Sequence, residues 1–225
     1  MEQNENGFMA VLNKMANCLI VNTCWFAACL PIFTIGASTT AMYATIQKSI
    51  LHDRGYVWST FWKEFKSNFK NATIVWLLVL LVGAVMTFDI RFLFGEAQNG
   101  KGWGLLYLLI AVMLVLLILT TLYCFGYLAK FETRRWAAFR NSFTIMLMHP
   151  FKNLWFLFLG VLMILLIAFL QWMILFLPVF YMLSFVQFLE NTFYDLMTDE
   201  EKEREDERNR DYAIEERKQK EEKKK

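Results

Sequence analysis

Charged side chains are absent from four long stretches of the chain, and this pattern decides its class. The stretches hold 33, 18, 28 and 37 residues and cover residues 15–47, 71–88, 102–129 and 153–189. A helix needs about 20 mostly apolar residues to cross the hydrocarbon core of a bilayer, which is about 30 Å thick. The pattern therefore predicts an all-α, polytopic membrane protein built as a bundle of transmembrane helices.

The length of each stretch predicts how often it crosses. The second and third suit one crossing each, and the segment between them is rich in glycine and asparagine, which suit a tight solvated turn. The fourth would form a helix about 55 Å long, too long for one crossing, so we expect two spans with a turn near Gln171 and Trp172. The spans expected after the first stretch are 71–90, 103–129, 153–170 and 173–190.

The first stretch, residues 15–47, contains a break. Pro31 removes a backbone hydrogen bond and Gly36 weakens the helix, so we expect the helix to be broken near 31–36. One broken crossing, or a crossing and a half-helix, gives about five spans with the amino end outside, and six is the alternative. The domains are then an N-terminal segment 1–14, a transmembrane domain 15–197 and a charged tail 198–225.

Lysine and arginine indicate which side each loop occupies. They gather in the loops after the first and third stretches, whereas the short segment after the second stretch holds only Arg91 and Lys101. Because loops rich in these residues stay in the cytoplasm, both basic loops and the tail are expected there. The loop residues are Lys48, Arg54, Lys63, Lys66 and Lys70, and Lys130, Arg134, Arg135, Arg140 and Lys152.

The tail has a different composition from the rest of the chain. Residues 199–225 hold 12 of the 21 acidic and 10 of the 23 basic side chains, and Tyr212, Ala213 and Ile214 are their only apolar cluster. Such a segment cannot build a core. We expect a solvated helix that continues from the last span, with disorder as the alternative.

Aromatic residues recur in the two basic loops. Trp58, Phe61 and Phe65 return as Trp136, Phe139 and Phe143, each 78 positions later, and Phe69-Lys70-Asn71 returns as Phe151-Lys152-Asn153, 82 positions later. The recurrence predicts a parallel repeat of span, basic amphipathic helix and span, although chance similarity of aromatic-rich loops is the alternative. Aromatics at i, i+3 and i+7 form one stripe, so we expect two interfacial helices on the cytoplasmic side. The six aromatic residues are a candidate docking surface for a cytoplasmic partner, and lipid anchoring is the alternative.

Motifs for catalysis are missing from the sequence. The run GEAQNGK at 95–101 resembles the start of a phosphate-binding loop, but Gly102 stands where a serine or threonine must bind magnesium. His52 and His149 lie in separate loops without a cluster of cysteines or carboxylates. We therefore expect no catalytic residue, no cofactor, no metal site and no nucleic-acid partner, and the protein is not expected to be an enzyme.

The break in the first stretch supplies the candidate polar site. Carbonyl groups freed by the break are expected beside Thr34, Gly36, Ser38 and Thr39, where they would line a polar cavity at membrane depth. Hydrogen bonds between helices are the alternative role for these hydroxyl groups.

The same segment carries a family resemblance. The residues concerned are Asn17, Asn22, Trp25, the run Leu30-Pro31-Ile32-Phe33-Thr34-Ile35-Gly36-Ala37, Ala41, Tyr43, Phe61, Phe65 and Phe69-Lys70-Asn71. This pattern resembles the YesL family, a domain-of-unknown-function group of small bacterial membrane proteins, over roughly residues 10–195. The resemblance implies a multi-pass plasma-membrane protein often found beside carbohydrate uptake and polysaccharide-degradation systems. It supplies no functional residues.

Three function classes remain, and the third, an intramembrane enzyme, ranks last because no constellation of residues supports it. The first is an accessory or regulatory component associated with carbohydrate uptake, whose partner is the permease or ATPase of a carbohydrate ABC transporter. The alternative is a small transporter in its own right, with its polar site at the break near residues 31–40. The lipid bilayer is an expected partner in both.

Overall fold

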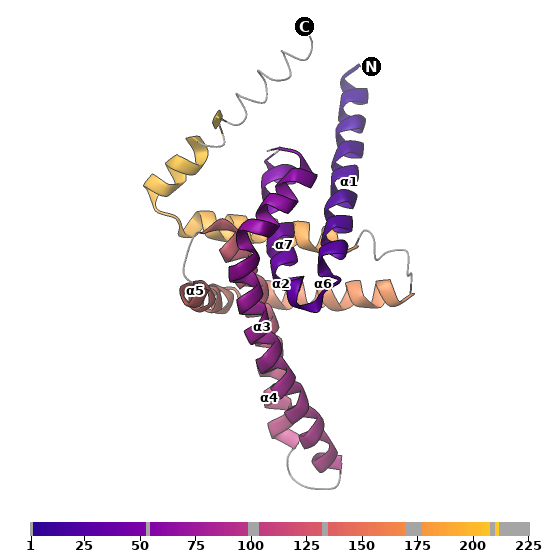
Figure 1. The fold of residues 1–225 in the computed structure, drawn as a ribbon, viewed down its shortest axis with the longest axis vertical. Helices are drawn as coiled ribbons and strands as arrows, with labels where there is room; N and C mark the ends of the chain where they lie inside the picture. The colour runs from indigo at the N-terminus through magenta and orange to yellow at the C-terminus, as the bar shows by residue number, and fades with distance from the viewer. Residues whose placement is uncertain are drawn as a thin grey trace.

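The computed structural model describes residues 2–52, 55–98, 104–131, 135–169, 177–207 and 210–211, and within them the chain is helical and forms no strand (Figure 1). This confirms the all-α prediction. The elements are α1 (Glu2–Cys29), the short 3₁₀ helix η1 (Ile32–Thr34), α2 (Ile35–Thr45), the π-helical η2 (Ile46–Leu51), α3 (Val57–Gln98), α4 (Gly104–Lys130), α5 (Arg135–Met148), α6 (Pro150–Phe169) and α7 (Leu177–Leu196). A further helical segment covers residues 199–207.

The first uncharged stretch folds as a hairpin. Pro31 has an extended backbone (φ −78°, ψ 121°) between α1 and η1. Across this break the hydroxyl of Ser38 donates to the Trp25 carbonyl at 3.0 Å, and the Trp25 indole donates to Thr39 at 3.3 Å. Residues before the break thus pair with residues after it, and α1 and α2 run antiparallel (Figure 1). The break falls where the sequence predicts it, because proline cannot extend α1. The chain reverses direction there instead of continuing one crossing, and the hydrogen bonds between Trp25 and Ser38 and Thr39 hold α2 back along α1.

Helices α3 and α4 form a second antiparallel hairpin. The rings of Trp76 and Phe125 lie 6.3 Å apart, and those of Phe94 and Tyr107 lie 5.6 Å apart at the other end of the pair. The order of these contacts agrees with the antiparallel pair that the sequence predicts. Its turn, residues 99–103, lies outside the described residues.

The two copies of the repeat differ in one respect. Helix α3 runs unbroken for 42 residues, so residues 57–70 continue directly into the apolar segment and do not form a separate helix. In the second copy α5 ends at Met148 and α6 begins at Pro150. Proline at this position cannot donate to the preceding turn and disfavours helical backbone at His149. The equivalent position in the first copy is Asn68, which lets the helix continue.

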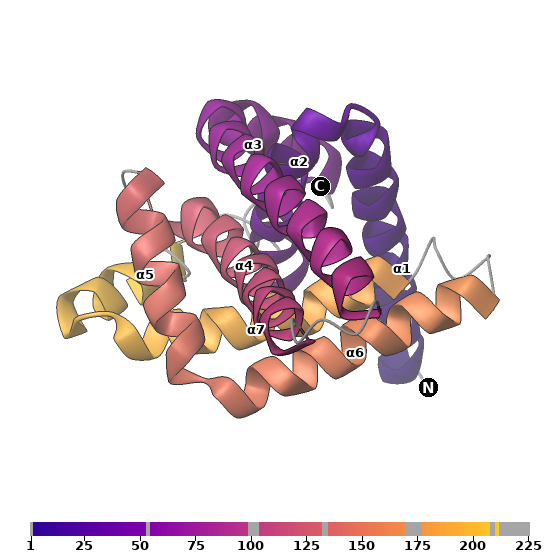
Figure 2. The same cartoon turned by 90° about the horizontal axis from the view of Figure 1, so that it is seen from below.

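Helices α6 and α7 form the third antiparallel pair. The ring of Phe156 lies 5.2 Å from that of Phe185, and a Cβ on Gly160 would lie 3.7 Å from the Tyr181 hydroxyl. The turn expected near Gln171 and Trp172 lies outside the described residues. In Figures 1 and 2 this pair runs across the direction of α3 and α4, a geometry that the sequence does not predict.

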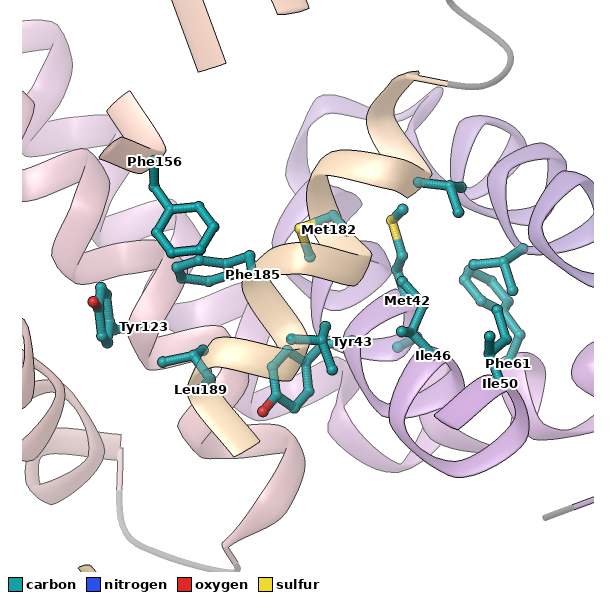
Figure 3. Close-up of a cluster of buried hydrophobic side chains, with 14 of the residues drawn as sticks. Met42, Tyr43, Ile46, Ile50, Phe61, Tyr123, Phe156, Met182, Phe185 and Leu189 are labelled. Atoms are coloured by element: carbon teal, nitrogen blue, oxygen red, sulfur yellow. The ribbon is translucent and has the colours of Figure 1, made fainter. Parts of the chain in front are cut away.

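The core gathers around α2 and α7. The ten residues from Gly36 to Thr45 are all buried. Figure 3 shows α7 between two groups of side chains, with Met42 and Tyr43 of α2 on one side and Tyr123 and Phe156 on the other. The small residues of α2 make this possible because they let neighbouring backbones approach closely.

Apolar side chains cover the outer surface of α3, α4 and α6. Examples more than half exposed are Leu81, Phe88 and Phe92 on α3, Leu108, Val112 and Met113 on α4, and Leu154, Phe158 and Ile164 on α6. Soluble proteins rarely expose a contiguous apolar surface of this extent. The same three helices are long and apolar enough to cross a membrane, over Val57–Gly95, Leu106–Lys130 and Pro150–Phe169.

Candidate functional site

The hydroxyl groups at the break bond to the chain itself. Thr34 is 4% exposed, and its Oγ1 atom lies 2.6 Å from the carbonyl oxygens of both Ala28 and Pro31. Ser38 and Thr39 bond to Trp25, as described above. The carbonyl of Ile32 accepts a hydrogen bond of 2.8 Å from the Trp76 indole on α3. The polar groups freed by the break are therefore largely satisfied within the protein.

Gly36 has a packing role at this site. A Cβ at this position would lie 2.6 Å from the Cβ of Trp76 and 2.8 Å from the Ala72 carbonyl oxygen. Such contacts are too short for real side chains, so only glycine lets α2 lie this close to α3. The structure thus brings Thr34, Gly36, Ser38 and Thr39 to one place, where they hold α1, α2 and α3 together.

The first aromatic set faces mostly inward. Phe61 is fully buried in the main core cluster, and Phe65 is half-buried against the same cluster. Trp58 is 59% exposed, and its ring packs edge-on against Trp62 at 5.8 Å. Of the three residues singled out in the sequence, Trp58 alone offers a free contact surface.

The second aromatic set is more exposed. Trp136 is 75% exposed and Phe143 is 42% exposed, whereas Phe139 is half-buried. Trp136 and Phe139 also line a hollow of about 910 Å³ between α3, α4 and α5. Its other lining residues are Asn71, Ile74, Val75, Leu78, Val79, Val82, Leu117 and Arg135.

A buried charged cluster joins the ends of α4 and α7 to the tail. Nζ of Lys130 lies 2.7 Å from Oε2 of Glu190 and 3.4 Å from Oε1 of Glu205, and all three side chains are at most 13% exposed. The Tyr43 hydroxyl donates to Oε1 of Glu190 at 2.9 Å. Two buried carboxylates thus share one lysine, and Oε2 of Glu205 is buried with no hydrogen-bond partner among the described residues.

This cluster also shows how the first part of the tail packs. Helix α7 ends at Leu196, and the tail restarts at Thr198, whose backbone N–H donates to Oε2 of Glu201 at 3.0 Å and whose hydroxyl donates to the same atom at 3.1 Å. The segment 199–207 then packs Glu205 against Lys130 instead of continuing α7 into solvent. Pattern reasoning missed the cluster because Lys130 and Glu190 looked like the ends of uncharged stretches. The available signal was that Glu190 follows 37 uncharged residues, a position where a lone carboxylate needs a partner.

A second ion pair lies at the start of α3. Nζ of Lys48 lies 2.7 Å from Oε1 of Glu64, which ties η2 to α3. Among the residues that the structure describes, no group of three or more histidine, cysteine, aspartate or glutamate side chains is arranged to hold a metal ion.

The helical fold, the lipid-facing surface of α3, α4 and α6 and the internally satisfied polar groups together define a membrane-embedded helical protein. A family model described as "Protein of unknown function, DUF624" matches residues 18–90. The YesL family is this family, so the match confirms the resemblance over residues 18–90. No curated protein and no solved structure matches the chain.

Proposed function

We propose that this protein is a bacterial plasma-membrane component that assists carbohydrate uptake, that it acts through a partner, and that it is not an enzyme. The family resemblance supports the association with uptake. The hydrogen bonding at the break favours an accessory role. The hydroxyl groups there bond to Trp25, Ala28 and Pro31 within the chain, so they are not available to a substrate. A transport site needs polar groups that are available to a substrate.

The proposed contact surface is the exposed aromatic pair of the basic segments. Trp58 and Trp136 are 59% and 75% exposed, and exposed tryptophan is enriched at the centre of protein interfaces. The partner is the permease or ATPase of a carbohydrate ABC transporter. Phe61 takes no part in this surface, because it is buried.

Crosslinking in native membranes followed by identification of the partners tests this proposal. Changing Trp58→Ala and Trp136→Ala together should abolish recovery of the permease or ATPase. Trp155→Ala is the matched control, because Trp155 is also 59% exposed but lies on α6. Equal recovery from all variants, or sugar flux into proteoliposomes that hold the pure protein alone, would refute the accessory role.

We also propose a topology with both termini in the cytoplasm. The α3–α4 hairpin crosses the bilayer with its basic ends inside, and α5 lies at the cytoplasmic interface. The reversal at Pro31 supports this, because it brings the start of α1 to the same end of the bundle as the start of α3 (Figure 1). An even number of crossings then replaces the five expected from the sequence.

Cysteine labelling of intact cells tests the topology. The four native cysteines, Cys18, Cys24, Cys29 and Cys124, are first replaced by alanine. A single cysteine is then placed at Lys14 or at Gly95, both of which are exposed. An impermeant maleimide should label the cysteine at position 95 and not that at 14. Labelling of position 14 from outside would refute this topology and support an odd number of crossings with the amino end outside.

A further inference from the structure

The hollow between α3, α4 and α5 has two chemically different ends. Six of its lining residues are aliphatic: Ile74, Val75, Leu78, Val79 and Val82 on α3 and Leu117 on α4. The α3 residues lie at helical spacing on one face, so they form a continuous apolar wall. Asn71 and Arg135 are the polar members of the lining.

Packing places the polar members at one end. Ala138 of α5 belongs to the same buried cluster as Val75 of α3 and Leu128 of α4. Asn71 lies about one turn from Val75 along α3, and Arg135 lies less than one turn from Ala138 along α5, which packs on α4. Val82 and Leu117 mark the opposite, wholly apolar end, because the antiparallel register pairs these levels of α3 and α4.

The dimensions match one leaflet of a bilayer. From Asn71 to Val82 the helix rises about 16 Å, and half of a hydrocarbon core of about 30 Å is about 15 Å. The volume of about 910 Å³ lies in the range of small-molecule sites. The length of the hollow and its apolar wall therefore suit an acyl chain of one leaflet.

The positive charge at the Arg135 end of the hollow favours an anionic headgroup. Among the described residues no carboxylate forms an ion pair with Arg135, and Lys70, which precedes Asn71, is exposed and likewise makes no such pair. Arginine binds phosphate through two parallel hydrogen bonds. The exposed indole of Trp136 is suited to the level of lipid headgroups.

We propose that this hollow is a binding site for an anionic glycerophospholipid, with one acyl chain along the α3 wall and the phosphate on Arg135. The site holds a lipid of the leaflet on the side of the basic segments. This inference goes beyond the proposed function, because it needs the membrane-embedded fold and no protein partner.

Native mass spectrometry of the full chain in detergent tests the headgroup. The probes are phosphatidylglycerol and phosphatidylcholine with identical acyl chains. The wild-type protein should bind phosphatidylglycerol about fivefold more tightly than phosphatidylcholine. Arg135→Gln should remove that preference without weakening the binding of phosphatidylcholine. Arg135→Lys should restore much of it. Arg140→Gln is the matched control, since Arg140 is a basic residue of α5 outside the lining, and it should change nothing. An unchanged preference in Arg135→Gln would overturn the proposal.

A second measurement tests the chain-binding wall. In Val82→Trp the larger side chain should fill the apolar end of the hollow and abolish binding of both lipids. Val82 is 44% exposed, so the fold should tolerate the change. A photoreactive residue at Leu78 should crosslink lipid in native membranes. Crosslinking to a protein instead of lipid, undiminished binding in Val82→Trp, or displacement of the lipid by soluble glycerol 3-phosphate would each refute the site.

Discussion

Lys130 and Glu190 form an ion pair of 2.7 Å that holds the end of α4 against α7, with both side chains largely removed from solvent. Tyr43 of α2 bonds to the same carboxylate, and Glu205 of the tail approaches the same lysine. Helices α2, α4 and α7 and the tail segment therefore meet around one cation. Lys130 also lies 5.9 Å from the centre of the Phe193 ring, and its side chain is only 5% exposed.

Lys130→Met should be among the most destabilising single changes in the chain. It leaves the carboxylates of Glu190 and Glu205 buried without their cation, and breaking a buried pair in this way costs about 3–5 kcal/mol. Thermal unfolding of the purified protein in detergent measures the loss. Lys63→Met is the control, because Lys63 is an exposed lysine of α3. Equal unfolding temperatures for the two variants would show that the cluster contributes nothing.

Gly36→Ala should separate α2 from α3. The added methyl group would lie 2.6 Å from the Cβ of Trp76 and 2.8 Å from a backbone oxygen, neither of which can move away alone. Overpacking of this kind costs about 1–3 kcal/mol. Gly95→Ala is a matched change on α3 with nothing within 4 Å of the new methyl group. Its unfolding temperature should equal or exceed that of the wild-type protein, whereas that of Gly36→Ala should fall.

Thr34→Val tests whether the break is structural. The variant keeps the shape of the side chain but removes the hydroxyl donor from the Ala28 carbonyl, whereas the Pro31 carbonyl still accepts from the Thr34 N–H at 3.0 Å. Leaving a buried polar group without its partner costs about 1–3 kcal/mol. Thr23→Val is the control, because Thr23 is exposed and its hydroxyl bonds only to the preceding turn, at Leu19. Denaturant unfolding compares the two. If the variants unfold alike and Thr34→Val instead abolishes uptake of a sugar, the break is a transport site.

The cap of the tail helix should respond to acid. The hydrogen bond from the Thr198 backbone N–H, aided by the Thr198 hydroxyl, lowers the pKa of Glu201. The folded-state pKa therefore lies below the unfolded one, so the cap stabilises the helix above the unfolded pKa and is lost as the pH falls through the folded pKa. Carbon NMR shifts of Glu201 in the full chain should follow this transition. Thr198→Ala should raise the pKa of Glu201 towards its ordinary value, and Glu200→Gln should leave it in place.

The sequence predicts the helices and the break at Pro31 well because they depend on local chemistry. Pro31 ends α1 by its missing N–H, and the third uncharged stretch gives α4 its length, whereas α3, with 42 residues, is far longer than its uncharged stretch of 18. The direction of the chain after Pro31 is not local. It depends on Ser38 and Thr39 finding Trp25, contacts that no periodicity reveals.

The same reasoning explains the two aromatic sets. Identical spacing in the repeat predicts identical roles, but Phe61 is buried while Trp136 is exposed. Burial depends on what packs against each helix, and α3 and α5 have different neighbours since Pro150 separates α5 from α6. The structure places the candidate residues at the break side by side, but their role as a polar site stays a prediction. The Lys130 cluster needs tertiary structure to be seen.

The unbroken course of α3 has a mechanical consequence. At about 63 Å it is roughly twice the thickness of the hydrocarbon core, so about half of it must stand clear of the lipid tails. Phe61 is buried in the core and Glu64 pairs with Lys48, so the first turns of this helix are fixed to the rest of the protein. The part of α3 beyond Trp76 therefore projects together with α4 as a cantilever that is anchored at its basic end.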